Sequence, residues 1–296
     1  MREGWNMRRL QLLRELQLRE TITAVAAALG YSPSTVSQQL AQLEREVGTA
    51  LLQPEGRRVR LTANGELIAA HAARVMALEE DVRGRLEPEV TAMTRVRVAS
   101  IQTVGRAIVP RMLEILAASH PALRVEVAVV PPEHALFELE ARGYDLVIAE
   151  QYPGHTRERR VGLDRQLLWH DAIRLATAPG DDVRTLADAR DRSWIMEPEG
   201  TAARAWAVQQ CRAAGFEPDV RFEADDLLAH IRFIAAGHAV GMLPGLALVG
   251  DEDAVRTLDL PGAPDREIFT TARESSAASP GVRAVRAALR EAIAAR

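Results

Sequence analysis

Hydrophobic residues recur at helical spacing near the start of the chain and predict three consecutive short helices. Leucines three or four residues apart mark the first helix, over residues 8–20. Alanines mark the second, which Thr23 can cap and Gly30 can end. The third helix begins with Ser32 as its N-cap and Pro33 in its first turn, where the missing N–H of proline is tolerated. The second and third helices meet through a three-residue turn.

The third predicted helix has two different faces. An apolar stripe must be buried against the first two helices, and it consists of Val36, Leu40, Leu43 and Val47. A separate face carries small, uncharged side chains with hydrogen-bonding groups, namely Ser34, Ser37, Gln38 and the neighbouring Ala41. Such side chains suit a close approach to base edges in a DNA major groove. An exposed helix also tolerates serine and glutamine without binding anything, so this face alone leaves both interpretations open.

Arginines follow the third helix, in a stretch that reads as a turn leading into a short strand, "PEGRRVRLT" at 54–62. Beside a reading helix, such a hairpin would neutralise phosphates and give affinity without sequence choice. A solvated arginine cluster is the alternative interpretation. The candidate DNA-binding residues are Thr23, Ser32, Pro33, Ser34, Thr35, Ser37, Gln38, Arg57 and Arg58.

The net charge changes sign along the chain, near residue 62. Residues 1–62 contain nine arginines and six acidic residues, a net charge of +3, although the whole chain carries −4. The remainder is therefore acidic, at −7. A basic front on an acidic chain favours nucleic-acid contact near the N-terminus.

A long helix is predicted from Thr62 to Pro88. Its apolar positions keep a spacing of three and four residues, which is typical of a coiled-coil seam, and they are Ile68, His71, Val75, Leu78 and Val82. About three heptads are too short to hold a dimer without other surfaces. Either this seam is a dimerisation surface or the helix packs on its own domain, and His71 is expected to be a packed histidine.

After Pro88 the pattern changes to strands that alternate with helices, which predicts an α/β fold of two doubly wound subdomains. The last strand and the last helix should return to the first sheet, which we expect to be parallel. The predicted strands are 95–101, 123–130, 144–150, 172–179, 193–198, 219–224, 239–244 and 266–273, and the predicted helices are 106–119, 133–143, 201–215, 226–237 and 281–296.

Ligands of open parallel sheets bind beyond the carboxyl ends of the strands. The polar residues at these ends predict a small-molecule effector site, and they are Ser100, Gln102, Thr103, Glu199, Gly200, Thr201 and Asp225. Ser100 and Thr201 can equally be plain helix caps. Because the carboxylates of Glu199 and Asp225 would repel an anion, we expect a neutral or amine effector, such as an amino acid.

Enzyme motifs are missing from the sequence: there is no GxGxxG, P-loop, GxSxG or HExxH pattern. The seven histidines are scattered and Cys211 is the only cysteine, so we expect neither catalysis, nor a metal site, nor a cofactor. No export signal or membrane span is present, which favours a cytoplasmic protein without a membrane partner. A solute-binding protein or an enzyme alone would leave the first 87 residues unexplained, so either alternative would need an added DNA-binding domain. A repressor that needs no effector remains an alternative.

The segments "TAVAAALGYSPSTVSQQLAQLEREVGTALL" and "RRVRLTANGELIAAHA" resemble the winged helix-turn-helix of the LysR-type transcriptional regulators, over roughly residues 7–87. The chain departs from the family's usual pattern in two places. The segment "SPS" after the turn bears on which operator sequence is read, and "LLQPEGR" before the wing bears on the geometry of the wing. The resemblance implies an all-α winged helix-turn-helix and a linker helix, followed by an α/β, periplasmic-binding-protein-like effector domain.

The same resemblance implies how the chain is divided and assembled. The segments are a DNA-binding domain at 1–62, a linker (dimerisation) helix at 63–88, one effector subdomain at 89–163 and 266–296, and another at 164–265. Paired linker helices would make a homodimer, and two dimers a homotetramer. The implied partners are double-stranded DNA with inverted repeats, a small-molecule effector and RNA polymerase.

Overall fold

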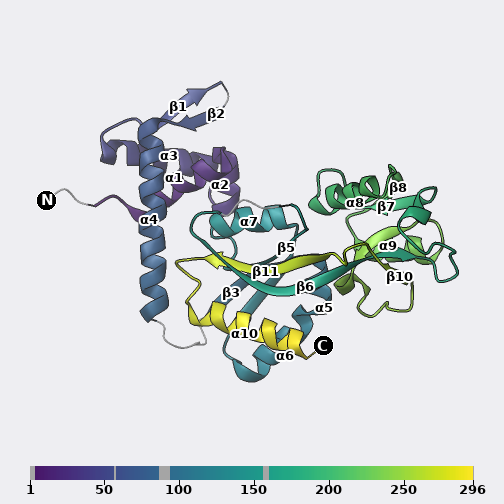
Figure 1. Ribbon diagram of the computed structural model, residues 1–296. Helices are drawn as coiled ribbons and strands as arrows, with labels where there is room; N and C mark the ends of the chain where they lie inside the picture. The colour runs from purple at the N-terminus through teal and green to yellow at the C-terminus, as the bar shows by residue number, and fades with distance from the viewer. Residues whose placement is uncertain (1–3, 57, 87–93, 156–159, 296) are drawn as a thin grey trace. The chain divides into compact units, whose positions relative to one another are not determined.

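The computed structural model describes residues 4–56, 58–86, 94–155 and 160–295 of the 296-residue chain, and Figure 1 labels its helices and strands. The chain divides into two compact units, Met1–Pro88 and Glu89–Arg296. The first unit is helical with one small β-hairpin, and the second is an α/β unit.

The first unit contains the three predicted helices, a hairpin and a long helix. Its elements are α1 (Met7–Arg19), α2 (Ile22–Leu29), α3 (Pro33–Val47), β1 (Leu52–Glu55), β2 (Arg58–Leu61) and α4 (Ala63–Leu86). The two strands pair antiparallel, with Leu52 opposite Leu61 and Glu55 opposite Arg58. Three helices followed by this hairpin form the winged helix-turn-helix that the sequence predicts.

The apolar stripe of α3 is buried in the core of the first unit. Val36, Leu40 and Leu43 are at most 1% exposed and pack with leucines of α1, while Val47 lies at the edge of this core. The carboxylate of Glu44 accepts hydrogen bonds from two successive backbone N–H groups at the start of the hairpin, at 2.8 and 3.0 Å. The end of α3 and the wing are therefore held together.

The ends of the short helices follow the sequence with one correction. Ser32 caps α3 through its side chain, and Gly30 ends α2 in the left-handed conformation, with φ of 71°. The prediction that Thr23 caps the second helix is wrong. Thr21 is the cap, because its hydroxyl accepts a hydrogen bond from the Ala24 N–H at 3.2 Å.

Helix α4 is buried only along its first half. Ile68 is 6% exposed and lies in the core of the first unit with Ala69 and Ala72, so at this residue the helix packs on its own domain, the alternative to a dimerisation seam. The reason is geometric: the first turns of α4 pack against α1. Farther along, Leu78 and Val82 are 65% and 46% exposed.

The second unit begins and ends with one subdomain. Its elements are β3 (Arg95–Ser100), α5 (Gln102–Ala107), α6 (Val109–Ser119), β4 (Arg124–Val129), α7 (Pro132–Glu140), β5 (Leu146–Gln151), and later β11 (Asp265–Arg273) and α10 (Pro280–Ala294). Helices α6 and α10 pack on one face of the sheet and α7 packs on the other, as expected for a doubly wound fold. Strand β11 returns to this sheet beside β5, also as predicted.

The other subdomain lies between these elements in the chain. It contains β7 (Ser193–Met196), α8 (Ala202–Ala213), β8 (Asp219–Glu223), α9 (Leu227–Ala235), β9 (Gly241–Pro244) and β10 (Arg256–Asp259), with short 3-10 turns at Ala187–Ala189 (η1) and Gly245–Leu248 (η2). One core packs around Trp194 and Trp206, and a second around Ile231 and Ile234. Strand β10 has no counterpart among the predicted elements.

Two long strands connect the subdomains. Strand β6 (Leu163–Thr177) pairs with β11 along its first part and with β9 and β10 along its last part, and Figure 1 shows β6 and β11 running side by side. The strand begins nine residues before the predicted strand at 172–179, since its first half contains as many polar as apolar residues and does not read as buried. Because β11 runs antiparallel to β5, the first sheet is mixed rather than parallel.

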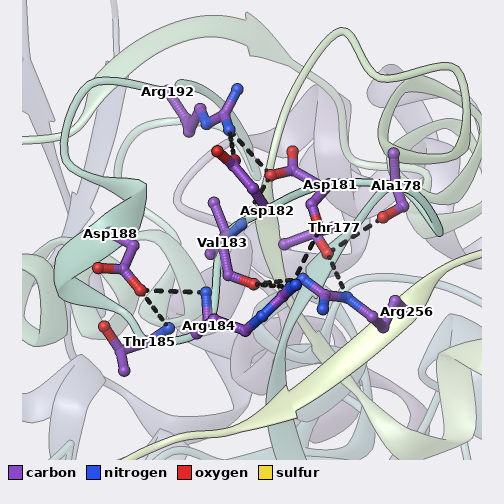
Figure 2. Close-up of polar contacts among 10 residues, drawn as sticks. All are labelled: Thr177, Ala178, Asp181, Asp182, Val183, Arg184, Thr185, Asp188, Arg192 and Arg256. Carbon is purple, nitrogen blue, oxygen red and sulfur yellow. Dashed lines mark hydrogen bonds and ion pairs between the residues drawn. The ribbon is translucent and has the colours of Figure 1, made fainter.

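The long loop between β6 and β7 is held by a polar cluster (Figure 2). Arg256 of β10 donates to the Val183 carbonyl and lies 3.4 Å from the hydroxyl of Thr177. Arg192 pairs with Asp181 at 2.9 Å, and one carboxylate oxygen of Asp188 accepts two backbone N–H groups at 2.8 and 3.0 Å. These contacts order a loop that has little secondary structure and fix it to an edge strand.

Substitution of Gly65 tests the packing between the wing and α4. A Cβ atom at this position would lie 2.1 Å from the Leu51 carbonyl oxygen, which is backbone and cannot rotate away. We expect Gly65→Ala to destabilise the protein by about 3 kcal/mol, measured by chemical denaturation. Gly180→Ala is the control, because nothing lies within 4 Å of its added Cβ; equal stability of the two variants would contradict this packing.

Candidate functional site

The polar face of α3 is exposed, but most of its hydroxyl groups already have partners. The Ser32 hydroxyl lies 2.8 Å from those of Ser34 and Thr35, and the Ser37 hydroxyl donates to the Pro33 carbonyl at 3.0 Å. Exposed Gln38 differs, since its side-chain amide has no hydrogen-bond partner within the described residues. This amide is the group on the face best placed to make new hydrogen bonds. Thr23 is exposed near the start of α2.

The wing presents arginines of two kinds. Arg60 lies 3.6 Å from Glu55, and both side chains are more than 60% exposed, so solvent screens the pair. Arg58 is exposed and has no ion-pair partner in the part of the chain that the structure describes. Arg57 falls outside the described residues. Arg58 is thus the described wing arginine whose charge is free to meet a phosphate.

The predicted seam on α4 divides into a packed and an open part. The His71 ring packs edge-on against the Trp5 ring, with centroids 5.4 Å apart. Val75 is half-buried, whereas Leu78 and Val82 are exposed and Leu86 is 74% exposed. Within the first unit, the C-terminal half of α4 therefore presents an uncovered apolar stripe.

The polar residues at the end of β3 and just after it have different environments. Ser100 is buried and donates to the Ile101 carbonyl at 3.0 Å. Gln102 reaches the start of α9 in the other subdomain, donating to Asp226 at 2.8 Å and accepting from the Leu227 N–H at 3.2 Å. The structure therefore identifies Gln102 as a direct polar bridge between the subdomains.

The predicted residues before α8 and at Asp225 lie at the surface. The Glu199 side chain is 87% exposed, and Asp225 is exposed as well. Thr201 caps α8 and also donates to the Pro198 carbonyl at 2.9 Å, so both hydrogen-bonding roles of its hydroxyl are taken. Gly200 adopts φ of 88°, which allows the turn into the helix. These positions shape the turn, and the carboxylate that faces inward belongs to another residue.

That residue is Glu197, directly after β7, which sequence reasoning missed. It lines a pocket together with Tyr152, Arg204, Trp206 and the apolar Met242 and Ile173. Burial, followed by repulsion from Glu150, raises the pKa of the Glu197 carboxyl to about 7. The rule that ligands bind at carboxyl ends of strands points to Glu197 as much as to Glu199, so the signal was present in the sequence.

A buried charge network lies beside this pocket on the long strands. Arg266 of β11 is opposite Asp171 of β6, donates to its carboxylate at 2.8 and 3.0 Å, and also pairs with Glu150. Thr103, predicted for the effector site, accepts from the same guanidinium at 2.8 Å. Burial lowers the pKa of Arg266, but the neighbouring carboxylates outweigh it and raise that pKa overall. Sequence reasoning missed Arg266, since the cross-strand register cannot be read from the sequence.

The lone thiol belongs to a core. Cys211 of α8 is fully buried, and burial, with a smaller contribution from Glu217, raises its pKa to about 12. Within the described residues, no group of three or more His, Cys, Asp or Glu residues is placed to hold a metal ion. The helices in that part of the chain are all too short or too polar to cross a membrane.

Each of the two units matches a known protein family. Residues 7–66 match the family described as "Bacterial regulatory helix-turn-helix protein, lysR family", and residues 91–294 match "LysR substrate binding domain". A relative is the transcriptional dual regulator GltC of Bacillus subtilis, 24% identical over 247 residues that cover 80% of each chain. Another is the hydrogen peroxide-inducible genes activator of Dickeya chrysanthemi, 24% identical over 253 residues, 82% of this chain and 80% of the relative.

A solved structure has a similar fold over nearly the whole length. It is a full-length OxyR variant from Pseudomonas aeruginosa, with a TM-score of 0.70, 18% identity, and coverage of 97% of this chain and 95% of that one. At this identity the likeness supports the architecture, while the two family matches together span most of the sequence. The chain belongs to the LysR family of DNA-binding transcriptional regulators with an effector-binding domain.

Proposed function

We propose that this regulator reads an inverted-repeat operator with α3 and holds its backbone with the wing. The observation that carries the proposal is an uncharged, exposed helix face in the same unit as an exposed wing arginine. Among the described residues, the Gln38 amide on this face has no hydrogen-bond partner and Arg58 has no ion-pair partner. Glutamine can contact adenine through two hydrogen bonds, and arginine neutralises phosphate. The remaining candidates, Thr23, Ser32, Pro33, Ser34, Thr35, Ser37 and Arg57, would support this contact at the backbone and at base edges.

Dimerisation through α4 would duplicate the reading face. The exposed stripe of Leu78, Val82 and Leu86 fits a partner helix, with Val75 and His71 at its edge. Two-fold symmetry would then place the two α3 helices on half-sites about 10 bp apart, or a multiple of that. Two such dimers would form a homotetramer, and contact with RNA polymerase would link DNA binding to transcription. We place this activity in the cytoplasm.

The small-molecule signal would act between the two subdomains. The Gln102 bridge to Asp226 and Leu227 is a contact whose geometry depends on how far the subdomains are closed. An effector that binds one degree of closure better than another shifts the population toward it. Acidic side chains at 197, 199 and 225 favour a neutral or amine effector, such as an amino acid. This role is sensory, so no catalytic step is assigned to the domain.

Thiol oxidation does not fit as the signal in this chain, although one relative is a hydrogen peroxide-inducible genes activator. The thiolate is the form that reacts with oxidants, and buried Cys211 with its pKa of about 12 holds almost none of it at neutral pH. A single cysteine also cannot form a disulfide within one chain. Metabolite binding is therefore the better-supported trigger.

Variants of Gln38 and Arg58 separate base reading from phosphate contact. Gln38→Ala should relax sequence choice at one operator position, with a loss of about five- to 100-fold in discrimination. Arg58→Ala should weaken binding to all duplexes and reduce the slope of log Kd against log salt by about 1. Fluorescence anisotropy with the upstream region of this gene and a scrambled duplex measures both. Arg83→Ala on α4 is the control, and parent-like behaviour of both variants would refute the assignment.

Peroxide provides a test of the trigger. The parent and Cys211→Ala should bind operator DNA with the same Kd before and after millimolar hydrogen peroxide, because the buried thiol does not react. Intact-mass measurement reports any oxygen added to the cysteine. A peroxide effect on DNA binding that is present in the parent and absent from Cys211→Ala would show that the thiol is the sensor.

A further inference from the structure

We propose that the pocket lined by Tyr152, Glu197 and Trp206, called here the ammonium pocket, binds the protonated amino group of an amine or amino-acid effector. The inference rests on the proposed function, because it names the chemical class of the molecule to which the regulator responds. It is carried by a cavity with aromatic and apolar walls, whose Glu197 carboxylate has no partner among the residues that the structure describes.

The walls of the ammonium pocket suit an organic cation with an apolar body. The rings of Tyr152 and Trp206 are buried, and their centroids lie 5.7 Å apart at 42°. Aromatic faces attract a cation within about 6 Å of the ring centroid. Met242 and Ile173 add apolar surface to the same cavity. The cavity admits a charged head of about the size of an ammonium group, and such a head matches this lining.

The arginine in the pocket wall does not neutralise Glu197. The Arg204 guanidinium donates to the backbone carbonyl of Glu197 at 3.0 Å, and it lies 3.6 Å from the Glu223 carboxylate and 4.0 Å from that of Glu199. Its charge is thus balanced by two other carboxylates. The side-chain carboxylate of Glu197 has no hydrogen-bond or ion-pair partner within the described residues.

The buried guanidinium of Arg266 is likewise committed. Its hydrogen bonds go to Asp171, Glu150 and Thr103, so two carboxylates already balance one positive charge. A ligand carboxylate would therefore meet no unpaired cation in this part of the cleft. An ammonium group, in contrast, would pair with Glu197 and relieve its repulsion from Glu150.

The acidity of Glu197 gives the proposal a pH signature. Burial and nearby acids raise its pKa to about 7; the charged groups that face it are Glu150 of β5, Glu133 of α7, Asp225 after β8, Arg204 of α8 and Arg266 of β11. Only the carboxylate form attracts an ammonium group. With this pKa, about one-tenth of the sites are ionised at pH 6 and about nine-tenths at pH 8. The affinity should therefore rise about tenfold across that range.

A matched set of three compounds tests the charge preference on the full-length protein. L-Norleucine carries both charges, n-pentylamine lacks its carboxylate, and hexanoate lacks its amino group. Thermal shift and calorimetric titration at pH 8 should show binding of n-pentylamine and none of hexanoate. Binding of norleucine as well would identify an amino-acid effector, and its exclusion would identify an amine. Amine binding should be about tenfold weaker at pH 6, where the ligand itself remains charged.

Glu197→Gln should abolish the response to n-pentylamine and its pH dependence, whereas Glu217→Gln, at an exposed position outside the pocket, should keep both. The Glu197 variant should fold, because glutamine removes an ionisation that costs the folded protein stability. A carboxyl whose pKa is raised in the folded state makes the protein less stable as pH rises through 7. Its melting temperature at pH 8 should accordingly equal or exceed that of the parent.

Three results would overturn the proposal: no response of the parent to either ammonium compound, stabilisation by hexanoate, or amine binding retained by Glu197→Gln. Anisotropy with operator DNA is measured on the same samples. Specific DNA binding together with any of these three results would reject the ammonium pocket and leave the regulator assignment standing. Loss of specific DNA binding would instead reject the proposed function itself.

Discussion

The effector unit depends on one buried ion pair, between Arg266 and Asp171 on the two strands that connect its subdomains. The pair spans β6 and β11 in register, and the Asp171 carboxylate also accepts the Leu246 N–H at 3.0 Å. Burying such charges costs several kcal/mol unless their hydrogen bonds are all made, and here Glu150 and Thr103 complete the guanidinium's contacts. A network this fully bonded keeps the connecting strands together whichever position the subdomains take.

This ion pair holds the two connecting strands in place, whereas the contact between the subdomains at Gln102 is free to change. The connecting strands are paired along their length, with one register shift, in addition to the ion pair. Gln102, in contrast, meets Asp226 and Leu227 through side-chain contacts at the surface. Opening of the cleft would break the exposed contact and preserve the buried one. An effector can therefore act by strengthening or replacing a weak bridge, which is the differential binding that a population shift requires.

The sequence predicted the elements far better than the side chains that face one another. Helix α3 could be placed closely because Ser32, Pro33 and Gly48 mark its ends locally. The choice between Thr21 and Thr23 as a cap depended on which hydroxyl reaches the Ala24 N–H, and composition does not decide that. The pairing of Arg266 with Asp171 and the burial of Ile68 depend on packing between distant segments, so only the folded structure reveals them.

The candidate site shows the same limit at the scale of two residues. The turn after β7 places Glu197 in the wall of the pocket and leaves Glu199 in solvent, although both glutamates follow the same strand. The difference matters because a carboxylate in water is stable without a partner, and one in an apolar pocket is not. Its raised pKa is the measure of that cost. A cation that neutralises Glu197 would therefore stabilise the receptor as well as being recognised by it, which couples ligand binding to the conformation that the regulator adopts.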